Sequence, residues 1–376
     1  MRQADDHHRI PARLLGACLG AAMLVSAMAT FPARADQPAR PKPLSAGDVV
    51  KAAPASAWVA IAPQDLLVMT LAPDAKGKAR QVIIQLMPAP FSQGWVGNVR
   101  KLAAAHWWDG LSVYRVQDNW VAQWGDGEGE DKAKAKPLPE GLVKVDEKDY
   151  VSNSANFAPY DELAGRMQLS PTQDNPSNFK IRPITIRLTG FVQGWPVGIA
   201  DTYGTYKASY HSAHLSKRDG ELVAKGKLII DTPPPPTAWP VHCYATVGVA
   251  RDLSPDTGTG AELYAVIGQP PRQLDRNIAV VGRVIEGIAN LSSLPRAPGN
   301  GVYKDIADRT PILSVRLASE LPADQQPHFE YLSTDSSDFA RYVYLRAHRQ
   351  DDFIKVPAAG ADICSIPVPI RRHPSS

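Results

Sequence analysis

Apolar and polar residues alternate along the chain in short stretches that predict β-strands. The stretches are rich in branched and aromatic residues, and clusters of Gly, Pro and Asp separate them. Residues 73–77 (PDAKG), for example, supply the turn residues that a hairpin between the first two stretches needs. The predicted strands are 65–71, 81–87, 111–116, 120–124, 246–250, 262–267, 278–285 and 311–317.

Two helices are expected among these strands. Apolar residues between 96 and 103 recur with the helical period of about 3.6, and Ser92 stands where an N-cap is expected. A shorter helix is expected near 288–294. This order of elements predicts a mainly β fold, a closed antiparallel barrel capped by helices, rather than a parallel α/β sheet.

The chain begins with a segment typical of secretory signal peptides. Arg9 and Arg13 precede an apolar run at 14–31, and small residues at 33–35 offer a cleavage site after Ala35. An uncleaved membrane anchor is an alternative, because the run approaches the length that spans a bilayer. A lipoprotein modified at Cys18 is another.

Composition changes divide the rest of the chain into segments. Residues 127–141 begin a charged, Gly- and Pro-rich stretch, and strand-like pieces at 181–188 and 221–230 indicate some β structure within it. One helix is expected near the end, around 338–346. The predicted organisation is a signal peptide at 1–35, a Pro-rich linker at 36–56, a barrel domain at 57–319 interrupted by an insertion at 127–240, and a C-terminal extension at 320–376.

The charge of the chain is nearly balanced, with 41 Lys and Arg against 38 Asp and Glu. This balance gives no indication of a nucleic-acid partner, which would require a concentrated basic surface. After removal of the signal peptide no membrane association is expected. The 34 prolines disfavour long helices and favour extended loops.

Two cysteines, Cys243 and Cys364, follow the signal peptide. In an exported protein the two can form a disulfide, and the sequence is equally consistent with two buried, unpaired thiols. The spacing of cysteines and histidines matches no metal-ligand motif, and His211 and His214 alone do not make a zinc site. No metal and no other cofactor is expected.

Three blocks of sequence carry a family resemblance. The first is Val-Tyr-Arg-Val at 113–116 with Trp-Val-Ala-Gln-Trp-Gly-Asp at 120–126, and the second is 247–251 with 260–264. The third is Leu274–Asp275 with 280–287 (VVGRVIEG). In this order and spacing the blocks resemble the signature of cyclophilin-type peptidyl-prolyl cis-trans isomerases, over a little under half of the chain that remains after the signal peptide. The insertion and the extension resemble a long, exported bacterial subgroup.

The resemblance implies a catalytic role for Arg115 and Gln123. Rotation about an X–Pro bond crosses a barrier of about 18–20 kcal/mol, because the amide has partial double-bond character. A donor aimed at the prolyl nitrogen favours the twisted amide of the transition state. Arg115 matches the family's catalytic arginine, and Gln123 matches the glutamine that orients it and binds the substrate backbone.

The substrate-binding residues are expected by the same resemblance. Trp120, Val121, Tyr264 and Leu274 would form an apolar pocket for the proline ring. The main chain of Ala250 and Arg251 would pair with the bound peptide, and Glu262 would add a carboxylate beside it. Five positions depart from the usual family residues: Trp124, Glu262, Leu263, Gln273 and Ile278.

These observations predict a monomeric isomerase, periplasmic or secreted, that acts on X–Pro bonds of exported, proline-containing polypeptides. A non-catalytic module that keeps the barrel and binds peptides or a partner is the alternative, since much of the pocket rim differs from the family pattern.

Overall fold

The structure is a computed structural model. It describes residues 44–152, 185–202, 215–218, 221–224, 237–351, 353–358 and 360–373. The expected signal peptide, and with it its alternatives, lies outside these residues, as do His211 and His214.

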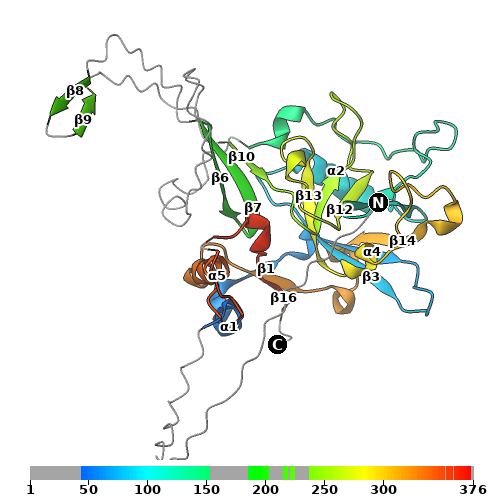
Figure 1. Cartoon of the computed structure of the whole chain (residues 1–376). Helices are drawn as coiled ribbons and strands as arrows, with labels where there is room; N and C mark the ends of the chain where they lie inside the picture. Colours follow the sequence, from blue (N-terminus) through cyan, green and yellow to red (C-terminus); the bar gives the residue numbers. More distant parts are fainter. Residues whose placement is uncertain are drawn as a thin grey trace, which may run out of the picture. The chain divides into compact units, whose positions relative to one another are not determined.

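Eight antiparallel strands close into a barrel in the order β11-β12-β5-β4-β14-β2-β3-β13, and β13 pairs back with β11. The predicted mainly β fold is therefore confirmed (Figure 1). Each of the eight predicted strands is present, with its ends shifted by at most two residues. The barrel strands are β2 (Leu66–Leu71), β3 (Arg80–Leu86), β4 (Ser112–Val116), β5 (Val121–Gly125), β11 (Thr246–Val249), β12 (Leu263–Val266), β13 (Val280–Glu286) and β14 (Thr310–Leu317).

The two faces of each strand have different surroundings, because successive side chains point to opposite sides of a sheet. In β5, Ala122 and Trp124 belong to the main core, whereas Val121 belongs to a separate apolar cluster on the other face. In β12, Leu263 and Ala265 likewise face the main core. The outward face of this part of the barrel is therefore available for a site.

Helix α2 (Gln93–Ala104) packs its apolar side into the main core, as the helical period predicted. The indole Nε1 of Trp95 donates to the carbonyl oxygen of Thr257 at 3.0 Å, which fixes the helix to the loop before β12. Ser92 is the N-cap residue, yet its φ of 52° places it in the left-handed region and its hydroxyl makes no capping bond. The expected short helix is α4 (Ala289–Ser292), whose Leu291 is fully buried.

The insertion begins as a segment packed on α2. Tyr150 stacks on Trp95 with ring centroids 5.2 Å apart, and Val145 is buried in the same core. The amide of Asn98 donates to the carbonyl of Val143 at 2.8 Å and accepts from its NH. Farther on, β6 (Thr185–Val192), β7 (Trp195–Thr202) and β10 (Thr237–Pro240) form a three-stranded sheet, and β8 (Leu215–Arg218) pairs with β9 (Glu221–Ala224).

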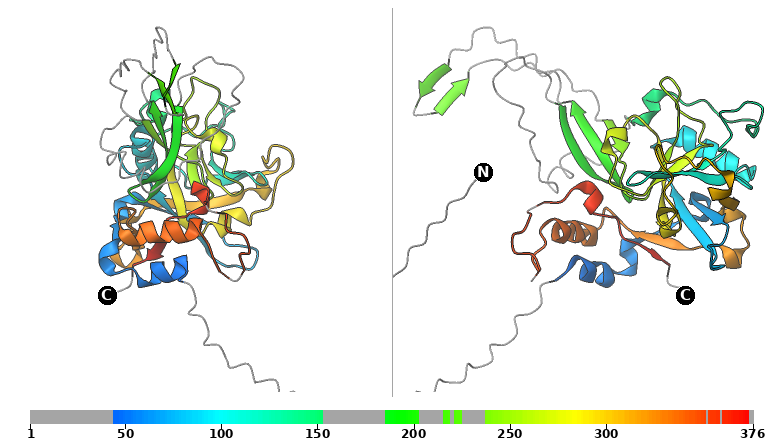
Figure 2. Two further views of the ribbon diagram at one scale, coloured as in Figure 1. Left: turned by 60° about the vertical axis from the view of Figure 1, so that its left-hand side comes forward. Right: turned by 45° about the vertical axis from the view of Figure 1, so that its right-hand side comes forward.

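The residues before and after the barrel form one further layer together. Strand β1 (Trp58–Ile61) pairs with β15 (Phe329–Leu332), which pairs with β16 (Ile370–Arg372). Helix α1 (Ala46–Ala52) lies beside α5 (Ser337–Ala347) and shares an apolar cluster with it (Figure 2).

Two expectations about the chain's segments differ from this arrangement. Part of the linker expected at 36–56 is helix α1, which Ser45 and Asp48 begin with a reciprocal capping box. Its one buried apolar residue, Val49, contacts the cluster shared with α5, so packing rather than composition decides the local structure. Residues 58–61, assigned to the barrel domain, pair with the extension instead.

Cys243 and Cys364 form a disulfide with Cα atoms 5.1 Å apart. The bond ties the extension to the loop between β10 and β11. Among the described residues, no helix is long and apolar enough to cross a membrane.

Candidate functional site

Four residues form a row across neighbouring barrel strands. Arg115 of β4 stands opposite Gln123 of β5, Gln123 opposite Tyr264 of β12, and Tyr264 opposite Gly248 of β11. Directly opposed residues of an antiparallel pair place their side chains on the same face. The sheet register thus brings Tyr264 beside Arg115 and Gln123, which share a hairpin far from Tyr264 in the sequence.

Three acceptors hold the guanidinium of Arg115. Its Nη1 donates to Gln123 Oε1 at 3.1 Å, its Nη2 to Gln117 Oε1 at 2.6 Å and its Nε to the carbonyl of Asn300 at 2.8 Å. The side chain is half-buried, and this loss of hydration lowers its pKa from the ordinary arginine value. An arginine has five N–H donors, so two remain for a ligand. No sequence motif indicated Gln117 or Asn300, and Asn300 contributes only a main-chain oxygen.

The amide of Gln123 is fixed on both sides. Because arginine cannot accept a hydrogen bond, Gln123 presents its oxygen to Arg115, and its Nε2 donates to the hydroxyl of Tyr114. Tyr114, which is next to Arg115 in the chain, was not among the predicted site residues. Its position within the first motif block was the only available signal.

Glu262 adds the expected carboxylate next to this group. Its Oε1 accepts from the main-chain NH of Asp126 at 2.6 Å. Burial raises the pKa of Glu262 to about 7, while hydrogen bonds from Asp126 and Tyr114 oppose the rise. Burial is also the main reason that the pKa of Tyr114 is raised, and the charge of Glu262 adds to it.

An apolar cluster lies beside the arginine on the same outward face. Val121, Tyr264 and Val266 are buried at its centre. Half-buried side chains surround them: Trp120, Ala250, Leu274 and Ile278. All four residues expected around a proline ring therefore lie in one cluster: Trp120, Val121, Tyr264 and Leu274. More than a hundred residues separate the first two from the last two in the sequence.

Ala250 and Arg251 follow the end of β11 and differ in their main-chain bonding. The NH of Ala250 donates to the carbonyl of Glu262 at 2.9 Å and is therefore occupied. Among the described residues, no hydrogen bond uses the main-chain NH or carbonyl of Arg251. Its side chain is held by the carbonyls of Asn277 and Asp252. Arg251 rather than Ala250 thus offers a free main-chain donor for an extended peptide.

Comparison with known proteins identifies the family. The model of the cyclophilin type peptidyl-prolyl cis-trans isomerases matches residues 81–317, well over half of the chain. The chain belongs to the cyclophilin-type isomerase family. No curated protein sequence matches it.

One of the similar solved structures supports the barrel fold. A cyclophilin from Hirschia baltica has a TM-score of 0.53 at 18% identity, and the match covers 84% of this chain and 92% of that one. A cyclophilin-type isomerase from Cryptosporidium parvum, crystallised in the presence of the dipeptide Ala-Pro, has a TM-score of 0.34 at 10% identity, with coverages of 66% and 98%. At these identities the first likeness concerns the fold alone.

The five departures from the cyclophilin pattern do not all alter the site. Trp124 and Leu263 point into the barrel and are about 1% exposed, so they belong to the main core. Trp124 therefore does not lie on the outward face with Gln123. Ile278 is in the apolar cluster, Gln273 is exposed and Glu262 lies by the arginine. Fewer of the five departures therefore alter the site than the sequence indicated.

A buried polar chain lies behind Tyr264. Its hydroxyl is 2.9 Å from Nε2 of His242, and Nδ1 of His242 is 3.0 Å from Oδ1 of Asp275. Arg272 Nε donates to the other carboxylate oxygen of Asp275 at 2.6 Å. His242 was not among the predicted residues. A tyrosine where cyclophilins usually have phenylalanine was the signal that its hydroxyl needs a partner.

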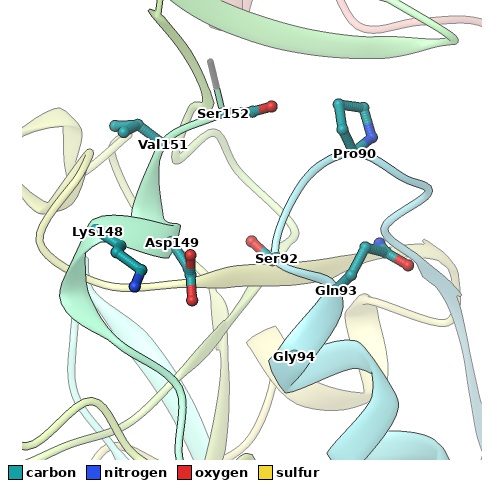
Figure 3. A pocket seen from close by; sticks show the side chains of 8 residues that line it. All are labelled: Pro90, Ser92, Gln93, Gly94, Lys148, Asp149, Val151 and Ser152. Atoms are coloured by element: carbon teal, nitrogen blue, oxygen red, sulfur yellow. The ribbon is translucent and has the colours of Figure 1, made fainter. Parts of the chain in front are cut away.

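Two cavities lie away from this row. One of about 540 Å³ lies where the insertion meets the start of α2, and it is bordered by Pro90, Ser92, Gln93, Gly94, Lys148, Asp149, Val151 and Ser152 (Figure 3). The other, of about 420 Å³, is bordered by residues 138, 139, 141–144 and 256–259. Neither is lined by a residue of the row or of the apolar cluster.

Proposed function

We propose that the chain isomerises X–Pro bonds of exported polypeptides and that Arg115 stabilises the twisted amide. The observation that supports this most strongly is the position of Arg115. Its guanidinium is clamped by Gln123, Gln117 and the Asn300 carbonyl. The same row of residues includes Tyr264, whose aromatic ring belongs to the apolar cluster.

The apolar cluster binds the proline ring in this proposal. The side chain of proline is apolar, and the half-buried rim of Trp120, Ala250, Leu274 and Ile278 loses more water when a ring covers it. The free main-chain groups of Arg251 pair with the peptide at the end of β11, as in recognition by strand addition. These contacts hold the X–Pro bond beside Arg115.

Arg115 acts on the transition state. In the planar amide the prolyl nitrogen shares its lone pair with the carbonyl, whereas in the twisted state the lone pair is localised. The two uncommitted N–H groups of Arg115 can donate to that lone pair, and this bond strengthens as the amide twists. Binding that is stronger in the transition state than in the ground state lowers the barrier. The clamp keeps the guanidinium oriented, and no bond is made or broken.

The exported location rests on two observations. Residues 1–35 have the pattern of a signal peptide, and the Cys243–Cys364 disulfide is typical of oxidising compartments. Substrates in the periplasm or outside the cell would then be other exported proteins, whose prolines isomerise slowly during folding. The protein acts as a monomer in this proposal.

An isomerisation assay tests the proposal. The full chain, expressed with its own N-terminal segment and purified after export, accelerates cis-to-trans exchange of a short peptide with a central Ala–Pro bond. Arg115→Ala lowers kcat/KM by about 100-fold or more, as expected for loss of a transition-state donor. Arg349→Ala, which removes an exposed arginine of the extension, leaves the rate unchanged. No acceleration by the wild type, or an Arg115→Ala variant of equal rate, excludes the proposed mechanism.

A non-catalytic binding module is the second candidate. It is favoured by the three-stranded sheet that the insertion adds and by the altered residues Glu262, beside the arginine, and Gln273, next to Leu274 of the apolar cluster. Such a module binds its peptide or partner equally well with Arg115→Ala and shows no exchange activity. Measurements of exchange and of peptide binding on the wild type and on Arg115→Ala therefore separate the two candidates.

A further inference from the structure

Tyr264 connects the apolar cluster to the polar chain behind it. Its ring is 4% exposed and packs with Val121 and Val266, so the ring itself belongs to the cluster. Its hydroxyl points away from the cluster to His242, which is fully buried. A hydroxyl buried here without a partner would cost stability, and His242 is the group that satisfies it.

The hydrogen bonds behind Tyr264 have a defined direction. Asp275 has its pKa lowered, although burial opposes this, because His242 and Arg272 donate to its carboxylate. A charged carboxylate only accepts, so Nδ1 of His242 carries the proton. With the proton on Nδ1, Nε2 is the nitrogen that can accept the Tyr264 hydroxyl proton across 2.9 Å. The main-chain NH of His242 also donates to Asp275 at 2.9 Å, which fixes the backbone as well as the ring.

Space behind the Tyr264 ring is provided by Gly248. The two residues are directly opposed in the β11–β12 pair. A Cβ atom at position 248 would overlap the hydroxyl and the ring atom that carries it. The tyrosine, the glycine and the histidine thus fit one another: the glycine leaves the space, the hydroxyl fills it, and the histidine binds the hydroxyl.

We propose that His242, held by Asp275, is a positioning residue that fixes the Tyr264 ring as one wall of the site for the proline side chain. The inference rests on the proposed function, because the ligand of this wall is a proline residue. His242 does not touch that ligand and acts only through Tyr264. It follows β10, the last strand of the insertion, and precedes the disulfide-bonded Cys243, so the end of the insertion determines the shape of the site.

A double-mutant cycle tests the proposal. Binding of a short peptide with a central Ala–Pro bond is measured by calorimetry for the wild type, His242→Leu, Tyr264→Phe and the double variant. His242→Leu weakens binding about fivefold, the effect of one lost hydrogen bond. In the Tyr264→Phe background the same substitution changes the affinity by less than about twofold, because the hydroxyl that His242 holds is gone.

Two further variants separate positioning from general stability. His242→Gln recovers most of the affinity, since its side-chain oxygen can accept the Tyr264 hydroxyl proton. His328→Leu replaces an exposed histidine of the extension and changes neither the peptide affinity nor the free energy of unfolding. If His242→Leu does not fold, the cycle is built with Asp275→Asn in its place, because this change removes the carboxylate that holds His242.

The outcomes are distinguishable from those of the proposed function. Equal effects of His242→Leu in both backgrounds overturn the positioning role, as does a variant that unfolds more readily but binds peptide normally. A wild type that binds the peptide without accelerating exchange refutes the isomerase proposal and leaves the positioning role intact. A wild type that binds no proline peptide refutes both.

Discussion

Gly248 lies directly opposite Tyr264 in the β11–β12 pair, and a methyl group on Gly248 would occupy the space of the Tyr264 hydroxyl. Gly248→Ala therefore displaces the ring and is expected to destabilise the fold by about 1–3 kcal/mol, the usual cost of overpacking. Peptide affinity falls as well, because the ring is a wall of the site. Chemical unfolding and calorimetry measure the two effects.

Gly97 provides the matched control. It lies within α2, and an added Cβ there meets no atom within 4 Å. Gly97→Ala is expected to stabilise the protein by up to about 1 kcal/mol, because alanine favours a helix interior. Equal effects of the two substitutions would contradict the packing argument for Gly248.

Gln117 clamps Arg115 with its side-chain oxygen, while its main chain bonds to Trp120 and Val121 of the apolar cluster. Gln117→Ala removes one of the three bonds that orient the guanidinium, and kcat/KM is expected to fall about 5- to 20-fold, equivalent to roughly 1–2 kcal/mol. Unfolding changes little, since the residue is half-exposed. The exchange assay measures the rate, and Gln325→Ala on the exposed side of the extension is the control. An unchanged rate would mean that Gln123 and Asn300 suffice.

Glu262 makes stability depend on pH. Its pKa is about 7 in the folded protein against an ordinary value of 4.5, so the folded state binds the proton more tightly than the unfolded state. Stability from this group is fully present below the unfolded pKa and is lost as the pH rises through the folded one. The loss between these limits is at most about 3 kcal/mol.

Glu262→Gln removes this pH dependence. As the pH rises from 5 to 8, the variant is expected to become more stable relative to the wild type, because its amide never ionises. The difference in the free energy of unfolding is set by the shift of the Glu262 pKa, at roughly 1.4 kcal/mol per pKa unit. Unfolding of both proteins by urea at several pH values measures the difference. Parallel stability curves would show that Glu262 does not titrate in this range.

The Cys243–Cys364 disulfide closes a loop across most of the second half of the chain. Replacement of both cysteines by serine is expected to lower the free energy of unfolding by about 2–5 kcal/mol. A reducing agent lowers that of the wild type by a similar amount and does not affect the serine variant. A wild type that is insensitive to reduction would contradict this role of the bond.

The barrel could be predicted from the sequence because each of its strands carries a local signal. Their apolar stretches are bounded by turn residues, which fixes the strand ends to within two positions. Strand β1 carries no such signal: its four residues do not alternate in burial, and its partner β15 lies far along the chain. Helix α1 was missed for a related reason, since the prolines around it dominate the composition.

The site could be predicted where side chains within one motif carry it. Arg115 and Gln123 have a fixed spacing on paired strands, so their contact follows from the hairpin. The Asn300 carbonyl leaves no trace in a side-chain pattern, although it holds Arg115 from 185 positions away. His242 lies outside the motif blocks, and its role depends on the choice of tyrosine at 264.

The sheet formed by β1, β15 and β16 has a consequence for how the protein is made. Strand β1 leaves the ribosome before any strand of the barrel, whereas its partner β15 and then β16 leave after all of them. Until then the apolar residues Trp58 and Ile61 have no partner strand, and Cys243 has no Cys364 to pair with. The protein therefore reaches its final form only after nearly the whole chain has been synthesised, because a shorter chain lacks the strand that completes this sheet and the cysteine that pairs with Cys243.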